Sequence, residues 1–195
     1  TNLDEAAAGV VVSAFGFQGQ KCSACSRVIV DAKIYDKFVE LIRQRTETIS
    51  VGPAYEMKTY MGPVINKRSM ESIQRYIDTA VKEGGKLVTG GGPAAGKGDF
   101  LKPTIIANVK PTDTIAQQEI FGPVVTIATF PDERQAVRLA NDVTYGLAAS
   151  IRSEAGIRKI FAIKERPFFD PLIVHISDLE QKKQVISDWP PLADY

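Results

Sequence analysis

Two cysteines three positions apart are the residues of this sequence best suited to covalent chemistry. Cys22 follows a bend that contains Gly19, and Lys21 directly precedes it in the segment FGFQGQKCSACSR, residues 15–27. A neighbouring cation and local backbone N–H groups favour the thiolate over the thiol. Because a thiolate is a strong nucleophile toward a carbonyl carbon, the pattern predicts that Cys22 can form a covalent bond to a carbonyl substrate.

The same cysteines also have simpler interpretations. A free cysteine is most often a small buried hydrophobic residue, and we favour this interpretation for Cys25, which packs or lines a pocket wall. The Cys-x-x-Cys spacing also permits a redox dithiol. A thioredoxin-like protein, however, has a strand before its first cysteine and a helix after it, and here the predicted order is the reverse. No metal site is expected, because two cysteines and His175, itself predicted in a strand or the core, do not supply the four ligands of a structural zinc.

Composition excludes several functional classes. The 195 residues suffice for one domain with a core, and 44% hydrophobic and 24% charged residues are typical of a globular protein. A net charge of +1 gives no reason to expect nucleic acid or an anionic membrane as a partner. The longest uncharged run, residues 6–20, is too short and too rich in glycine and serine to span a bilayer. With no visible signal peptide and only two cysteines, we expect a cytoplasmic protein.

Predicted helices and strands alternate along the chain, which indicates an α/β fold with a twisted, largely parallel sheet flanked by helices. Helices are expected to begin at capping residues: Thr1 or Asn2, Asn66 and Asp132. The strand that contains Pro103 is expected at a sheet edge, because proline cannot donate to a ladder. The predicted helices are residues 3–14, 34–49, 66–81 and 132–140, and the predicted strands are residues 28–30, 86–89, 100–106, 124–130 and 145–151.

A second short motif, EIFGP at residues 119–123, is by itself only the end of a helix followed by a Gly-Pro turn. Together with the Cys22 segment it resembles the aldehyde dehydrogenase family, whose signature combines an aromatic residue, Gly-Gln-x-Cys and a later Glu-x-Phe-Gly-Pro. The fit is closest to the branch that oxidises glutamate semialdehyde, the 1-pyrroline-5-carboxylate dehydrogenases, in which Gln-Lys-Cys-Ser-Ala-Cys-Ser-Arg is typical. Phe15, Gly19, Gln20 and Cys22 match the first element, and weaker family motifs follow at residues 61–65, 102–105 and 144–148.

The resemblance implies that residues 1–150 are a portion of an aldehyde dehydrogenase catalytic domain. Cys22 would be the nucleophile that attacks an aldehyde, with L-glutamate γ-semialdehyde as the expected substrate and NAD or NADP as the hydride acceptor. Glu119 would accept hydrogen bonds from the nicotinamide ribose hydroxyls, and Phe121 would pack beside the nicotinamide. Ser23 would help to bind the substrate carboxylate, and the backbone N–H of Cys22 would stabilise the oxyanion. A homo-oligomer is expected for the full-length protein.

The resemblance also implies that the chain is incomplete. The family's general-base glutamate, its oxyanion-stabilising asparagine and most of its nucleotide-binding domain belong to sequence upstream of the matching region, which this chain lacks. We therefore expect that the isolated chain does not oxidise aldehyde. The alternative from a different functional class is a non-catalytic fragment or interaction module that keeps the fold.

The tail, residues 151–195, is expected to depart from the family pattern. Lys164 and Arg166 resemble the ATP-binding pair of the threonylcarbamoyl-AMP synthases of tRNA modification, and Asp170 stands where that family usually has asparagine. Two interpretations remain open for this tail: a chimera or joined fragment, or a diverged tail that matches by chance. A further alternative function is therefore a fragment of a tRNA-modifying enzyme that binds a nucleotide.

Overall fold

The chain divides into two compact units, residues 1–144 and 145–195. The computed structural model describes residues 2–144, and the fold below is that of this first unit. The predicted strand at 145–151 and the predictions for the tail at 151–195, which concern Lys164, Arg166, Asp170 and His175, lie outside the described residues. The domain boundary at residue 150 stays a prediction.

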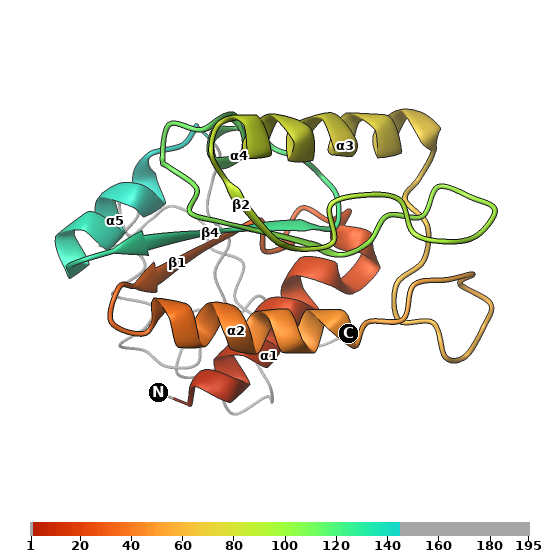
Figure 1. The fold of residues 1–195 in the computed structure, drawn as a ribbon, viewed down its shortest axis with the longest axis horizontal. Helices are drawn as coiled ribbons and strands as arrows, with labels where there is room; N and C mark the ends of the chain where they lie inside the picture. The colour runs from red at the N-terminus through yellow and green to blue at the C-terminus, as the bar shows by residue number, and fades with distance from the viewer. Residues whose placement is uncertain (1, 145–195) are drawn as a thin grey trace, which may run out of the picture. The chain divides into compact units, whose positions relative to one another are not determined.

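A four-stranded sheet forms the centre of the unit, in the order β1-β4-β3-β2 (Figure 1). Its strands are β1 (Arg27–Asp31), β2 (Lys86–Thr89), β3 (Thr104–Ala107) and β4 (Val124–Phe130). β4 pairs in parallel with both β1 and β3, and β2 is antiparallel to β3. The predicted α/β fold with a largely parallel sheet is therefore confirmed.

Helices cover both faces of this sheet. They are α1 (Leu3–Phe15), α2 (Tyr35–Glu47), α3 (Lys67–Lys82), the single turn α4 (Thr114–Gln117) and α5 (Glu133–Asn141). Figure 1 shows α1 and α2 on one side of the strands and α3 with α4 on the other. Within residues 2–144, no helix combines the length and the hydropathy that crossing a bilayer demands.

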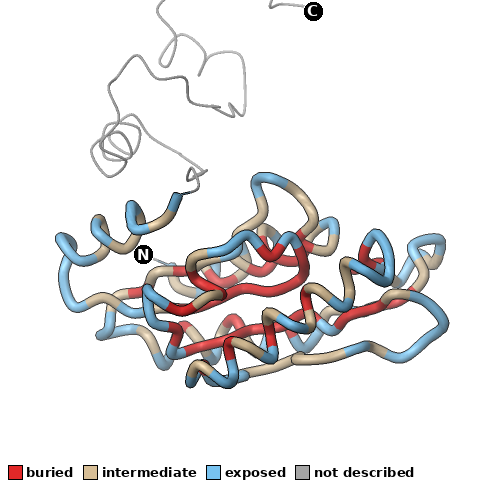
Figure 2. The backbone as a smooth tube through the Cα atoms, turned by 90° about the horizontal axis from the view of Figure 1, so that it is seen from above, coloured by how far each residue is buried: buried red, intermediate tan, exposed pale blue. Residues whose placement is uncertain are grey.

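The strands divide the core into two clusters, because successive side chains of a strand point to opposite faces. Ile105, Val125 and Ile127 pack with α1 and α2, whereas Ile106 and Val124 pack with α3 and α4. These strand residues are among the least exposed of residues 2–144. Figure 2 shows that buried segments, in red, run through the middle of the unit. Both layers of helices are thereby fixed to one rigid sheet.

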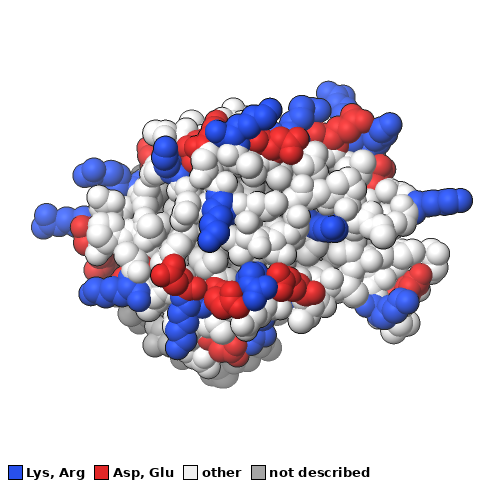
Figure 3. Space-filling view, in the orientation of Figure 1, with Lys and Arg blue, Asp and Glu red and all other residues white. Residues whose placement is uncertain are grey.

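Side chains cap three helices at the predicted residues. Asn2 accepts hydrogen bonds from the first backbone N–H groups of α1, Asn66 accepts from Ser69 N at 2.9 Å, and Asp132 accepts from Gln135 N at 2.9 Å. Each cap satisfies a donor that the helix itself cannot pair. On the face shown in Figure 3, charges of both signs are interspersed over α2 and α3, so no patch of one sign dominates that face.

The prediction that Pro103 marks an edge strand is wrong. β3 lies inside the sheet, between β4 and β2, and it begins at Thr104, one residue after the proline. Pro103 therefore never needs to donate to the ladder, and Thr104 N supplies the next hydrogen bond, to Pro123 O at 2.9 Å. The expected strand began too early because residues 100–103 are apolar enough to continue the β pattern.

Candidate active site

The parallel pairing of β1 with β4 brings the two chemistry-bearing motifs to the same edge of the sheet. Arg27 lies opposite Thr126 in the register, and Cys22 and Phe121 each stand five residues before their strand's member of that pair. Thr126 donates from its backbone N and its hydroxyl to Ser26 O, at 2.9 and 3.2 Å. The segments that precede both strands are thus joined where the strands begin.

A sharp turn after α1 carries the chain to Cys22. Phe17, Gln18 and Gly19 have consecutive positive φ angles of 54°, 59° and 64°, and Gln20 N closes the turn by donating to Phe17 O at 3.0 Å. Gly19 packs directly on the second motif, because a Cβ at Gly19 would lie 2.2 Å from Gly122 O. Only glycine combines this φ with so close a backbone approach.

The side chain of Gln20 connects three other segments to this turn. Its Nε2 donates to Phe121 O at 3.2 Å and to Ser69 Oγ, in the first turn of α3, at 3.0 Å. Its Oε1 accepts from Ile65 N at 2.9 Å. One amide two residues before Cys22 therefore contacts two of the other motif regions and a helix.

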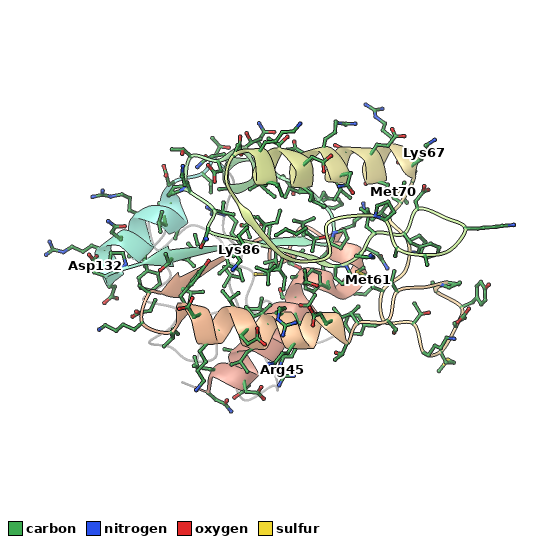
Figure 4. The ribbon with its side chains drawn as sticks, viewed as in Figure 1. Arg45, Met61, Lys67, Met70, Lys86 and Asp132 are labelled. Atoms are coloured by element: carbon green, nitrogen blue, oxygen red, sulfur yellow. The ribbon has the colours of Figure 1, made fainter. Side chains whose placement is uncertain are left out.

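Gln18 also forms a hydrogen bond to the motif at residues 61–65. With its amide oriented by its hydrogen-bond partners, its oxygen accepts from Gly62 N at 2.8 Å and its nitrogen donates to Phe17 O at 2.9 Å. The neighbouring Met61, labelled in Figure 4, is only 1% exposed and anchors this segment in the core. Motifs distant in sequence are thus joined through the two glutamines.

Cys22 and Ser23 are both exposed, in a turn that begins after Gln20. Ala24 N donates to Lys21 O at 3.0 Å, and Cys25 N donates to Ser13 O on α1 at 3.2 Å. Among residues 2–144, the backbone N–H groups of Cys22 and Ser23 have no acceptor. The Lys21 ammonium lies 5.9 Å from the centroid of the Phe17 ring. Its expected influence on the Cys22 thiol stays a prediction.

Glu119 and Phe121 project from the turn that precedes β4. Both side chains are exposed, and Phe121 has a φ of 53°, an uncommon conformation for an aromatic residue. Gly122 packs against α3 so closely that a Cβ there would lie 2.4 Å from Ile73 Cδ1. The turn is therefore held between α3 and the Gly19 bend, and its two exposed side chains are left free to meet a ligand.

Comparisons with known proteins identify the family of this chain. A sequence model described as the aldehyde dehydrogenase family matches residues 1–166. This chain belongs to the aldehyde dehydrogenase family. The match extends past residue 150 and includes Lys164 and Arg166, while the origin of the tail stays a prediction.

Similar aldehyde dehydrogenases are longer than this chain. The 1-pyrroline-5-carboxylate dehydrogenase of Staphylococcus aureus strain JH1 is 46% identical over 164 residues, which are 84% of this chain and 32% of that protein. The Thermus 1-pyrroline-5-carboxylate dehydrogenase solved with bound NAD is 42% identical with a TM-score of 0.75, over 81% of this chain and 31% of that one. An apo betaine aldehyde dehydrogenase mutant of S. aureus, which carries a BME-modified cysteine, is 33% identical with a TM-score of 0.79, over 85% and 34% of the two chains.

The sequence patterns do not reveal the residues that connect the parts of this candidate site. Gln20 belongs to the Cys22 motif, but its contacts to Ser69, Ile65 and Phe121 span from 45 to 101 positions of sequence. Gln18 and Ser69 carried no signal of their own. A polar residue inside a family signature with no assigned chemistry is the one hint that could have pointed to such a role.

Cys25, the second cysteine of the aldehyde dehydrogenase motif, packs against the core as predicted. It is partly buried beside the α1 and α2 cluster, and its Sγ lies 3.6 Å from Arg27 O. Burial raises the pKa of the Cys25 thiol to about 11, an effect that the hydrogen bond to Arg27 only partly offsets. A thiol with so high a pKa is a poor nucleophile at neutral pH.

This burial makes folding stability sensitive to alkaline pH. An unfolded cysteine titrates near pH ~8.5, so the folded state holds its proton more tightly. The resulting stabilisation is fully present below pH ~8.5 and is lost as the pH rises through about 11; it amounts to about 3 kcal/mol. Urea unfolding midpoints measured from pH 8 to 11 should fall less steeply in Cys25→Ala than in the natural chain. Equal slopes would show that Cys25 is not buried as described.

Proposed function

We propose that this chain is the catalytic-domain portion of an NAD(P)-dependent aldehyde dehydrogenase, with Cys22 as its nucleophile. The observation that carries the proposal is the contact between the exposed Cys22 loop and the turn that bears Glu119 and Phe121, through Gly19 and Gln20. Because the chain spans about a third of the curated relatives that it matches, the activity belongs to the complete protein.

The reaction begins at the Cys22 sulfur. The thiolate adds to the aldehyde carbon, a C–S bond forms, and the carbonyl electron pair moves onto oxygen. The backbone N–H of Cys22, which has no acceptor among the described residues, is suited to stabilise that oxyanion. After the carbon has been oxidised to a thioester, water adds to it, the C–S bond breaks, and carboxylic acid and free thiol are released.

The residues at the turn fit a nicotinamide dinucleotide. An exposed carboxylate at Glu119 can accept hydrogen bonds from two ribose hydroxyls, and the exposed ring of Phe121 offers an apolar surface beside the nicotinamide. When bound, NAD or NADP accepts the hydride that leaves the substrate carbon. The Thermus relative solved with bound NAD supports this assignment.

L-glutamate γ-semialdehyde, which is oxidised to glutamate, is the substrate that we propose. Its support is the name of the curated relatives, 1-pyrroline-5-carboxylate dehydrogenase, and the exposed hydroxyl of Ser23 next to the nucleophile. A hydroxyl beside the thiol can donate to the substrate's carboxylate while Cys22 holds its aldehyde carbon.

We also propose that the complete protein is a cytoplasmic homo-oligomer, which cell fractionation and light scattering would test.

The complete protein that carries this chain should form NADH from NAD+ and glutamate γ-semialdehyde. Ser23→Ala should raise KM for this substrate about 10- to 150-fold, because a hydrogen bond to a charged group is worth about 1.5 to 3 kcal/mol, and should leave kcat within about twofold. A short aliphatic aldehyde without a carboxylate is the control, and Ser23→Ala should not change its KM. The isolated 195-residue chain should produce no NADH at comparable rates. Absence of NADH from the complete protein with every aldehyde would overturn the proposed function.

A further inference from the structure

We propose that Gln20 is a positioning residue that fixes the nucleophile loop to the Phe121 turn and to the start of α3. The inference rests on the proposed function, because it concerns how the thiol and the dinucleotide-binding turn are held together. Gln20 stands two positions before Cys22, and its side chain, not its backbone, contacts the other segments. The three hydrogen-bond partners of the Gln20 side chain within residues 2–144 are protein atoms, so in this proposal it acts on the reaction through its neighbours.

The hydrogen bonds of Gln20 use both donors and the oxygen of its amide. Each hydrogen of Nε2 has an acceptor, Phe121 O at 3.2 Å and Ser69 Oγ at 3.0 Å, and Oε1 accepts from Ile65 N at 2.9 Å. The amide is partly buried, so losing a partner would leave a polar group poorly solvated. Asparagine is the only other side chain with a primary amide, and it is one methylene too short to reach the same partners.

Two variants remove different parts of this connection. Gln20→Glu keeps an oxygen for Ile65 N but loses both donors, and it brings a carboxylate against the carbonyl oxygen of Phe121. Gln20→Met keeps the length and removes every hydrogen bond. Gln44→Met is the matched control, because Gln44 is an exposed residue of α2 whose amide donates to Glu40 at 2.7 Å.

Hydrogen exchange on the 195-residue chain tests the connection itself. Gln20→Met should accelerate exchange at the amides of Ile65 and of Val124, whose N donates to Gly122 O, at least tenfold. Gln20→Glu should accelerate exchange at Val124 but leave Ile65 slow, since Ile65 N keeps its acceptor. Gln44→Met should change exchange at neither amide. Unchanged exchange in both Gln20 variants, or equal acceleration throughout the chain, would overturn the proposal.

Kinetics of the complete protein test the positioning role. Gln20→Met should lower kcat about 10- to 100-fold, because a small displacement between reacting groups is costly, while the rate of Cys22 alkylation stays within about threefold. A parallel fall in kcat, alkylation rate and unfolding midpoint would show a merely structural role and overturn the proposal. If the natural protein oxidised no aldehyde, the proposed function would fail, and the hydrogen-exchange result would still decide for or against the connection.

Discussion

Iodoacetamide at pH 7 is expected to alkylate Cys22 at least a hundredfold faster than Cys25. A thiol with a pKa of about 11 is ionised in only about one molecule in 10⁴ at this pH, against about three in a hundred for a free cysteine with a pKa of ~8.5. The higher intrinsic nucleophilicity of a high-pKa thiolate recovers about tenfold of this deficit. Packing of Cys25 against the core slows its reaction further, whereas the Cys22 side chain is exposed.

Mass spectrometry of the two cysteine-containing peptides over time measures both rates in one sample. Cys25→Ala should keep the fast reaction, and Cys22→Ala should remove it. N-acetylcysteine under the same conditions provides the reference for an unperturbed thiol. If its surroundings activate the Cys22 thiol, Cys22 should be alkylated faster than N-acetylcysteine. A slower reaction at Cys22 would instead favour the non-catalytic fragment or interaction module.

Gly19→Ala is expected to destabilise the fold by about 3 to 5 kcal/mol and to separate the two halves of the site. The alanine would have to adopt a φ of 64°, which costs about 1 to 2 kcal/mol in a residue with a Cβ. Its Cβ would also lie 2.2 Å from Gly122 O and 2.8 Å from Ala14 O, and both are backbone atoms that cannot rotate away. The Cys22 loop or the turn before β4 must therefore move.

Gly9→Ala is the matched control for this prediction. Gly9 lies in α1, where a Cβ would have no atom within 4 Å, so alanine should stabilise the helix by about 0.5 to 1 kcal/mol. Urea denaturation of the two variants and the natural chain gives the comparison. A Gly19→Ala chain as stable as the natural one would contradict the close packing of the Cys22 loop on Gly122.

Much of the fold could be predicted from the sequence because local signals agree with the final packing. The caps at Asn2, Asn66 and Asp132 lie directly before apolar repeats, and the β-branched runs that became β1 and β4 are bounded by turns. Such elements depend on neighbours within a few residues. Their order then leaves few ways to build a largely parallel sheet.

The errors and omissions concern non-local information. The order of the strands decides whether the strand after Pro103 lies at the edge of the sheet, and the residues next to Pro103 do not encode that order. The single turn α4 depends partly on Glu83, at the end of α3, which accepts from Thr114 N at 3.0 Å and from its hydroxyl at 2.6 Å. For the site, the residue types at Cys22 and Glu119 indicated chemistry, but no pattern within the loop shows which distant groups Gln20 reaches.

The equal spacing of Cys22 and Phe121 from the paired residues Arg27 and Thr126 restricts how this protein can change in length. The two segments of equal length are residues 22–27 and 121–126. One residue inserted into the first would lengthen it alone, by up to about 3.3 Å, which is more than the length of a hydrogen bond. An insertion or deletion in one segment would therefore have to be matched by the same change in the other. A substitution leaves the length of a segment unchanged, whereas a single insertion or deletion does not.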